Sequence, residues 1–258
     1  RLPESIAREE APVAALEPAP EMARPVAAAR YDAAFAAASR ISTPPRAGFD
    51  VLAIEPPAGT ARRGLEVAPD GRASIWFGTE AGNTHAVHAV VAATAEVARE
   101  ALRTELSGHQ GTLEAYAAGD LGFASFAGSV PDRVLFVRGN LFLQAWALGE
   151  GSAEDLALAL ARQARDEPAG RPGEGAAAPA LRVVDTARAG DSIEVAIDGV
   201  ESELVGSHFS ATGDASVTTS GGKVWLLAPN PGTVAIEATF FDRALRRSVV
   251  RLEVEVER

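Results

Sequence analysis

The sequence predicts an α+β region followed by an all-β region, and three observations support this division. Up to residue 166, apolar runs typical of strands alternate with segments of helical periodicity. A stretch rich in Pro, Gly and Ala then occupies residues 167–180. After this stretch, short segments alternate between apolar and polar residues, as half-buried strands do, and turns separate them. We therefore expect the α+β fold class, with an N-terminal mixed, mainly antiparallel sheet packed by helices and a C-terminal all-β sandwich.

The chain of 258 residues exceeds the commonest domain size, so two domains are expected. Composition divides it into an Ala/Pro/Glu-rich tether at residues 1–25, an α+β domain at 26–166, a Pro/Gly/Ala linker at 167–180 and a β-sandwich domain at 181–258. Tethers that hold an extracytoplasmic domain away from a membrane or wall have the composition of residues 1–25. The alternative is a terminus without a role.

Composition also limits the function. The formal net charge of -11 argues against nucleic-acid binding, because contact with phosphates needs clustered Lys and Arg. Cys is absent, which excludes disulfides, thiolate metal sites and Cys nucleophiles. No apolar run is long enough for a transmembrane segment. Because the chain begins at Arg1 rather than Met, a cleaved signal, an upstream anchor and an arbitrary boundary are all left open.

Two helices and three strands are expected in the first part of the α+β domain. The first helix runs from Pro25 to about Arg40, since Pro costs little at a first helical position and Thr43–Pro45 stops the helix. The second begins at Thr94, a natural N-cap, and continues through Leu106. Apolar runs bounded by turn residues predict the strands Asp50–Ile54, Ala73–Phe77 and Thr84–Val91.

A β-hairpin and a third helix are expected in the second part. Gly139–Asn140 joins the apolar runs Arg133–Arg138 and Leu141–Leu148, a strong hairpin pattern. Both faces of the second run are apolar, so this strand should lie centrally in the sheet. Ser152 with Asp155 three residues later resembles a capping box and predicts the start of the third helix.

Seven short strands are expected after the linker, in the number and spacing of a β-sandwich. The clearest is Val250–Val256, in which Val and Leu alternate with Arg and Glu. The other six are Leu181–Asp185, Ile193–Ile197, Glu203–Phe209, Ser216–Thr219, Lys223–Ala228 and Thr233–Phe240.

Three segments of this region combine alternation with flanking turns: Ala189–Val195, Lys223–Pro229 and Pro231–Glu237. They resemble the bacterial immunoglobulin-like (Ig-like) domains found on extracytoplasmic proteins. The resemblance covers only the last third of the chain, and the N-terminal two thirds is not recognised. It implies an Ig-like β-sandwich that acts as a spacer, adhesion or interaction module and carries no active site.

The sequence contains no pattern that predicts a catalytic, cofactor or metal site, and none is expected. His85 and His88 lie three apart in a predicted strand, so they point to opposite faces and cannot share an ion. Ser125 lacks the Gly-x-Ser-x-Gly spacing of a hydrolase nucleophile. One acidic turn matches no calcium-loop spacing and is interpreted as a solvated surface: Asp198, Glu201 and Glu203.

An apolar outer face is the one candidate interaction surface. It consists of Trp225, Leu227 and Phe241, provided that the core-facing residues are Val224, Leu226, Ile236 and Phe240. An exposed apolar patch needs a partner, so we expect it to dock on the first domain or on another protein. In the opposite register this face would itself be the core.

These observations together favour a non-catalytic binding or scaffolding protein of a bacterial envelope or surface. It is expected outside the cytoplasm (periplasmic, at the cell surface or secreted), with a protein partner or assembly and without nucleic acid. Two alternatives stay open. One is a structural subunit of a larger assembly. The other is a hydrolase whose site within 26–166 is assembled from dispersed residues such as Asp120, His88 and Arg138.

Overall fold

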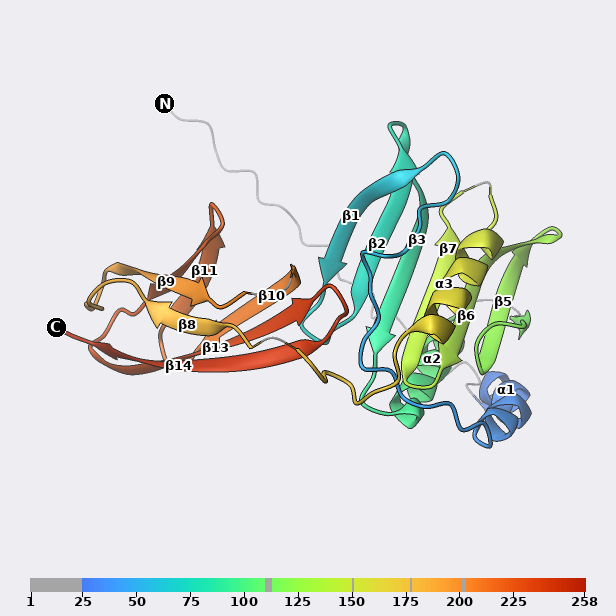
Figure 1. Cartoon of the computed structure of the whole chain (residues 1–258), viewed down its shortest axis with the longest axis horizontal. Helices are drawn as coiled ribbons and strands as arrows, with labels where there is room; N and C mark the ends of the chain where they lie inside the picture. Colours follow the sequence, from blue (N-terminus) through green and yellow to red (C-terminus); the bar gives the residue numbers. More distant parts are fainter. Residues whose placement is uncertain (1–24, 110–112, 150, 177, 201–202) are drawn as a thin grey trace, which may run out of the picture.

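The structure is a computed structural model that describes residues 25–109, 113–149, 151–176, 178–200 and 203–258 (Figure 1). The tether expected at residues 1–25 therefore lies outside the described residues, apart from its last position. The described strands form three antiparallel sheets, one in the N-terminal part of the chain and two in the C-terminal part.

The predicted α+β class is wrong, because the protein is mainly β. Among the described residues, fourteen strands make up most of the regular structure, and the helices are only three and short. The N-terminal sheet is antiparallel throughout rather than mixed. The prediction rested on the alternation of apolar runs with helical segments before residue 166. The error arises because strands with little apolar periodicity also join the sheet.

The N-terminal sheet has seven strands in the order β1-β2-β3-β7-β6-β5-β4. In chain order the strands are β1 (Ala61–Val67), β2 (Ala73–Thr79), β3 (Gly82–Val91), β4 (Glu114–Ala115), β5 (Leu121–Ala127), β6 (Val130–Arg138) and β7 (Leu141–Ala147). The hairpin predicted around Gly139–Asn140 is confirmed as β6–β7, and β7 lies at the centre of the sheet.

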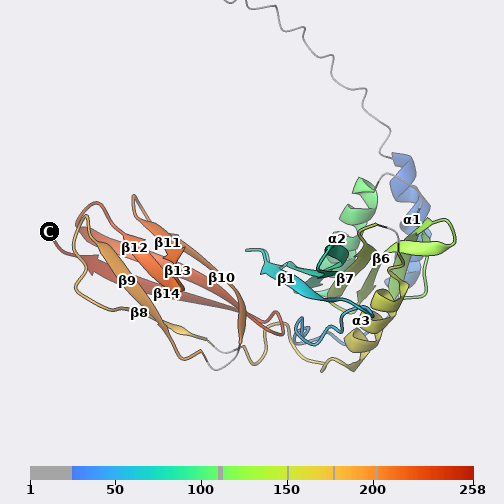
Figure 2. The same cartoon turned by 90° about the horizontal axis from the view of Figure 1, so that it is seen from above.

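Helices lie on both faces of this sheet (Figure 2). The helix α3 (Glu154–Asp166) packs on one face, and α1 (Pro25–Ala38) and α2 (Ala95–Gly108) lie on the other. The predicted N-cap of α2 is confirmed, since Thr94 Oγ1 accepts a hydrogen bond from the N–H of Val97 at 3.3 Å. The capping box predicted for α3 is wrong: the N-cap is Ala153, and Ser152 Oγ accepts from the N–H of Glu154.

The strand predicted at Asp50–Ile54 is wrong, and β1 was not expected. Residues 50–54 form an irregular segment, along which Arg62 of β1 donates from Nη2 to the carbonyls of Val51 and Leu52 at 3.2 and 2.9 Å. A side chain thus replaces a backbone ladder at this edge. With two Arg and one Gly in seven residues, β1 lacks the alternation that identifies a strand in sequence.

The C-terminal part contains a three-stranded sheet, β10-β13-β14, and a four-stranded sheet, β11-β12-β9-β8. The strands are β8 (Ala180–Val183), β9 (Ser192–Asp198), β10 (Leu204–Ala211), β11 (Ser216–Ser220), β12 (Lys223–Leu227), β13 (Gly232–Asp242) and β14 (Arg247–Val256). Both sheets contribute to one hydrophobic cluster. Four residues fix which faces point inward, because all of them lie in this cluster: Val224, Leu226, Ile236 and Phe240.

The tip of the β13–β14 hairpin inserts into the N-terminal core. Phe241 and Leu245 are 2% and 4% exposed and belong to the cluster formed by the N-terminal sheet and α3. Gly71 makes room for the ring of Phe241, since a Cβ there would lie 3.1 Å from Phe241 Cε1. Leu245 has a φ of 55°, a left-handed conformation that is unfavourable for a residue with a side chain. Its burial must therefore outweigh local strain.

Polar contacts hold the same tip in place. The N–H groups of Phe49 and Val51 donate to the carbonyls of Ala244 and Arg243 at 2.7 and 2.9 Å. Arg243 also forms an ion pair with Asp50, with Nη2 2.6 Å from Oδ2. The hairpin is therefore attached to residues 49–51 by backbone and side chains alike.

The segment predicted as a linker, residues 167–180, runs beside residues 45–47. The N–H of Gly170 donates to the carbonyl of Pro45 at 3.0 Å, and the N–H of Gly173 donates to that of Ala47 at 3.1 Å. Its first residue, Glu167, accepts from the N–H of Asp50. These bonds join the segment to the N-terminal part.

Asn140 connects the β6–β7 turn to two other segments. Its side chain is fully buried, Oδ1 accepts from the N–H of Arg46 at 2.6 Å, and Nδ2 donates to the carbonyls of Arg46 and Ala92. The sequence identified Asn140 only as a turn residue. In the structure its side chain replaces missing backbone partners of residues far away in the chain.

Replacing Phe241 by Ala is expected to lower the free energy of unfolding by about 3–5 kcal/mol, because it removes a buried ring from a packed core. Hydrogen exchange should also become faster in β2 and around Gly71. The matched control is Phe240→Ala, which leaves a cavity in the C-terminal cluster instead and should speed up hydrogen exchange there. Unchanged protection of β2 in Phe241→Ala would contradict the inserted tip.

Replacing Asn140 by Ala is expected to cost about 2–4 kcal/mol of stability, because several buried backbone groups lose their partners. Chemical denaturation measures this loss. Asn83→Ala, at an exposed position near the start of β3, is the control and should change stability by no more than about 0.5 kcal/mol. Equal effects of the two substitutions would show that the side-chain bonds of Asn140 contribute little.

Candidate functional site

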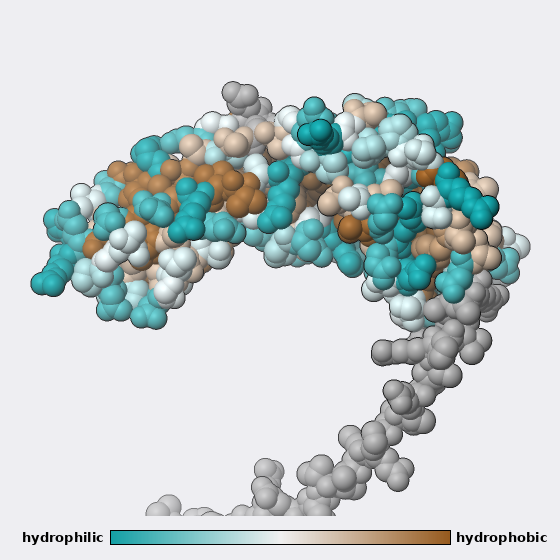
Figure 3. Space-filling view, turned by 90° about the horizontal axis from the view of Figure 1, so that it is seen from below, coloured by the Kyte–Doolittle hydropathy of each residue, from teal (hydrophilic) through white to brown (hydrophobic). Residues whose placement is uncertain are grey.

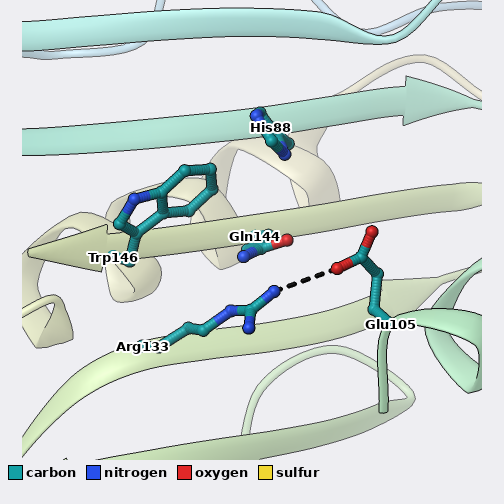
Figure 4. A pocket seen from close by; sticks show the side chains of 5 residues that line it. All are labelled: His88, Glu105, Arg133, Gln144 and Trp146. Atoms are coloured by element: carbon teal, nitrogen blue, oxygen red, sulfur yellow. Dashed lines mark hydrogen bonds and ion pairs between the residues drawn. The ribbon is translucent and has the colours of Figure 1, made fainter. Parts of the chain in front are cut away.

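A pocket of about 310 Å³ lies on the α2 face of the N-terminal sheet (Figure 4). Four elements contribute to it, and α2 covers only part of the sheet beside it. The lining residues are His88 on β3, Gln144 and Trp146 on β7, Arg133 on β6 and Glu105 on α2.

The strand register explains why these side chains meet. His88 lies directly opposite Gln144, and Trp146 lies directly opposite Arg133. Residues opposite each other on antiparallel strands point to the same face, and so do alternate residues of one strand. All four side chains therefore share one face, and Glu105 reaches them from α2.

Arg133 is held by several neighbours at once. Its Nη2 donates to Glu105 Oε2 at 3.0 Å, and its Nη1 donates to His109 Nδ1 at 3.1 Å. Turning the amide of Gln144 by 180° from the orientation in Figure 4 lets its oxygen accept from Nη2 and Nε of Arg133, at 2.7 and 2.5 Å. This orientation is the one that satisfies donors and acceptors. The guanidinium plane of Arg133 is thereby fixed.

The charges around the pocket do not cancel. Glu105 accepts from Arg133 and also lies 3.6 Å from Nη1 of Arg72, so two guanidinium groups share one carboxylate. Taken alone, this cluster has a formal charge of +1. Arg72 is the most exposed of the three, with 41% of its side chain accessible. The positive charge is therefore open to a solute on the side of Arg72.

His88 is neutral at physiological pH. Burial lowers the pKa of His88 from 6.5 to about 4, helped by the positive charge of Arg72 and Arg133 and opposed by Glu105. The ring meets Trp146 edge to face, with the centroids 4.4 Å apart. His88 and Trp146 thus form an uncharged aromatic wall beside the charged cluster.

This arrangement suits binding better than proton transfer. A general base works best with a pKa near the operating pH, and the pKa of His88 is far below it. The carboxylate of Glu105 is occupied by Arg72 and Arg133. The pocket offers an aromatic wall, the guanidinium group of Arg133 with Arg72 nearby, and a volume at the small end of ligand sites.

The structure brings together two of the three dispersed hydrolase residues, Asp120 and Arg138, but not His88. Asp120 accepts from Thr43 Oγ1 and from the N–H of Gly139, and it lies 3.8 Å from Nη1 of Arg138, at the β6–β7 turn. His88 lies in the pocket, among other residues. The convergence that a dispersed active site requires is therefore not present for Asp120, His88 and Arg138.

The two histidines of β3 point to opposite faces, as strand geometry predicts. The Nε2 of His85 lies 3.3 Å from the carbonyl of Ser152, near the start of α3, whereas His88 lies on the α2 side. Ser125 Oγ donates to Asp132 Oδ1 at 2.7 Å. Within the residues that the structure describes, no group of three or more His, Asp or Glu side chains could hold a metal ion.

The structure also separates the members of the predicted interaction surface, Trp225, Leu227 and Phe241. Trp225 and Leu227 lie on the outer face of β12, with the ammonium of Lys223 5.7 Å from the Trp225 ring centroid. Phe241 belongs to β13 in the other sheet and is buried in the N-terminal core. The three residues therefore form no common patch.

In the acidic turn, Asp198 pairs with Arg182, and Glu201 lies outside the described residues.

Comparisons with protein-family models, curated proteins and solved structures find no match to this chain. The described residues include no helix with the length and hydropathy needed to cross a membrane. The structure itself shows a mainly β protein with a small pocket on one sheet face, lined by aromatic and charged side chains.

The pocket was not predicted from the sequence, although one residue indicated it. Gln144 is the one polar residue in the apolar run Leu141–Ala147 and is 2% exposed. A buried polar side chain needs a partner, which could have indicated Arg133 across the hairpin. Glu105 gave no such indication, because it stands among other charged residues of an amphipathic helix.

The pKa of His88 predicts a specific dependence of stability on pH. The unfolded chain takes up a proton at His88 near pH 6.5, whereas the folded chain does so only near pH 4. Stability is therefore lost as the pH falls from 6.5 to about 4, since the unfolded state binds more protons there. His109, whose pKa burial and Arg133 also lower, adds to the same trend.

Titration of the His88 ring by NMR checks this prediction directly, with a midpoint near pH 4 expected. His88→Gln should flatten the fall in stability between pH 6.5 and 4, as measured by chemical denaturation. A midpoint near 6.5 would contradict the burial of His88.

Proposed function

We propose that this chain is a non-catalytic binding protein of a bacterial envelope or surface. In this proposal, the N-terminal sheet binds a small anionic group that has an apolar ring or chain. The observation that carries the proposal is the pocket itself: the guanidinium group of Arg133 and the aromatic wall of His88 and Trp146 line one cavity, and the more exposed Arg72 lies beside it, next to Glu105. A guanidinium group recognises carboxylates well, and aromatic side chains bury apolar surface.

The C-terminal part is proposed to be an Ig-like module that supports and positions the binding part. The resemblance of its turns and alternation to extracytoplasmic Ig-like domains motivates this role and the location outside the cytoplasm. The attachment of the β13–β14 hairpin tip to the N-terminal core favours this role, because a module that positions another part must be held firmly against it. The ligand group is then carried by a small molecule or by a partner protein at the cell surface.

Binding of benzoate tests the proposed ligand chemistry. Benzoate combines a carboxylate with one ring, so it should bind weakly and change the fluorescence of the native protein through Trp146. Benzamide, which lacks the charge, and acetate, which lacks the ring, should bind more weakly. Calorimetric titration of the full chain measures all three.

Two variants locate the binding. Arg72→Gln should weaken benzoate binding by about tenfold or more, because a charge-assisted contact is lost. Trp146→Leu should weaken both benzoate and benzamide. Arg182→Gln, at an exposed ion pair on β8, is the matched control and should bind as the native protein does. Benzoate binding that is unchanged in Arg72→Gln and Trp146→Leu would refute the proposed site.

A further inference from the structure

β14 forms the outer edge of the three-stranded sheet, so among the described residues no strand is hydrogen-bonded to the far side of its backbone, although β8 of the other sheet lies nearby. Edge strands present unpaired N–H and C=O groups that can pair with another chain. At 10 residues, β14 is also one of the longest strands of the protein. It is therefore a place where a second strand could add to the sheet.

Other segments of the chain limit the unpaired side of β14 at both ends. At its start, Gly173 lies beside the carbonyl oxygen of Arg247, at 3.7 Å from an added Cβ. Beyond its end, Glu257 exchanges backbone hydrogen bonds with Ala187 and Ala189. The open stretch thus runs from Ser248 to Val256, and its midpoint is Leu252.

Apolar side chains accompany this open edge. Val250 and Leu252 are only half-buried at the border of the C-terminal cluster, and Val249 and Val184 are 49% and 41% exposed. The view from below shows hydrophobic side chains gathered on the C-terminal part, on the side where β14 forms its lower border in Figure 1 (Figure 3). A strand added to β14 would cover part of this surface.

Two residues of opposite charge lie on either side of the same midpoint. Arg251 and Glu253 flank Leu252 on the outer face and form an ion pair of 3.3 Å between Nη2 and Oε1. Two antiparallel copies of β14 centred on Leu252 would place Arg251 of each copy opposite Glu253 of the other. Opposite charges facing each other across strands are stabilising, and like charges are destabilising.

Other registers are less favourable. Moving the centre to residue 251 places Arg251 opposite Arg251 of the second copy, and moving it to residue 253 places Glu253 opposite Glu253. A centre at residue 250 brings Arg247 opposite Glu253 but shortens the ladder, since Arg247 lies beside Gly173 and outside the open stretch. The charge pattern and the open stretch therefore favour one and the same centre.

We propose that β14 pairs with β14 of a second copy of this chain, antiparallel and centred on Leu252. The two three-stranded sheets then join into one continuous six-stranded sheet. Leu252 meets its counterpart, Val250 lies opposite Val254, and the ladder extends from Val249 to Glu255. This pairing makes the chain a symmetric dimer and places the two ligand pockets at opposite ends of it.

Analytical ultracentrifugation of the full chain at increasing concentration tests the dimer, at an ionic strength of about 0.15 M, where distant charges are screened. We expect a reversible monomer–dimer equilibrium. Arg251→Glu should weaken dimerisation by about tenfold or more, because both symmetric contacts become repulsive. Combining Arg251→Glu with Glu253→Arg exchanges the two charges and should restore the dimer.

Arg40→Glu is the matched control, since it changes the net charge equally at an exposed position near α1. It should leave dimerisation unchanged. Thermal melts of each variant verify that the fold is retained. The proposal is overturned if the native chain stays monomeric at all concentrations, in which case the edge would be available to a different protein. It is equally overturned if Arg251→Glu dimerises like the native chain, or if the double exchange fails to restore what the single one removes.

Discussion

Burial of Phe241 and Leu245 in the N-terminal core is the interaction on which the rest of the structure depends. Both residues lie at the tip of the β13–β14 hairpin of the C-terminal part, but their side chains pack in the core of the N-terminal sheet. The core below α3 is therefore completed by a hairpin that begins more than 60 residues after α3 ends. Neither part can be described as an independent unit with a free hinge, because removing the tip would open a cavity beside Gly71.

This insertion also explains why the pocket lies where it does. The α3 face of the N-terminal sheet is filled by the helix, by residues 49–54 and by the hairpin tip. Among the described residues, α1 and α2 cover the opposite face, where they pack mainly on Phe123, Leu135 and Phe142. His88 of β3 and Trp146 of β7 stay partly accessible there. A sheet with one completed and one half-covered face thus provides both stability and a binding surface.

The sequence allowed prediction of those elements whose cause is local. The Thr94 cap, the Gly139–Asn140 turn and the alternation in β14 all depend on neighbouring residues, and they were found. The fold class was wrong in part because β1 pairs with β2 although its sequence lacks the apolar alternation that identifies a strand. The pocket was missed for a related reason: Arg133, Gln144 and Glu105 meet only once strand order and helix position are known, and these are set by long-range packing.

The course of β14 has a mechanical consequence. Its first residues leave the hairpin tip buried in the N-terminal core, and its last residues lead to the C-terminus at the far end of the molecule (Figure 1). Tension applied between the C-terminus and the N-terminal part would therefore act along the strand axis. The backbone of β14 would carry it to the hairpin tip, where the buried side chains of Phe241 and Leu245 and the Arg243–Asp50 ion pair attach the strand to the N-terminal part. Stretching the protein along its long direction therefore loads the contacts of the tip before it loads the hydrogen bonds between β13 and β14.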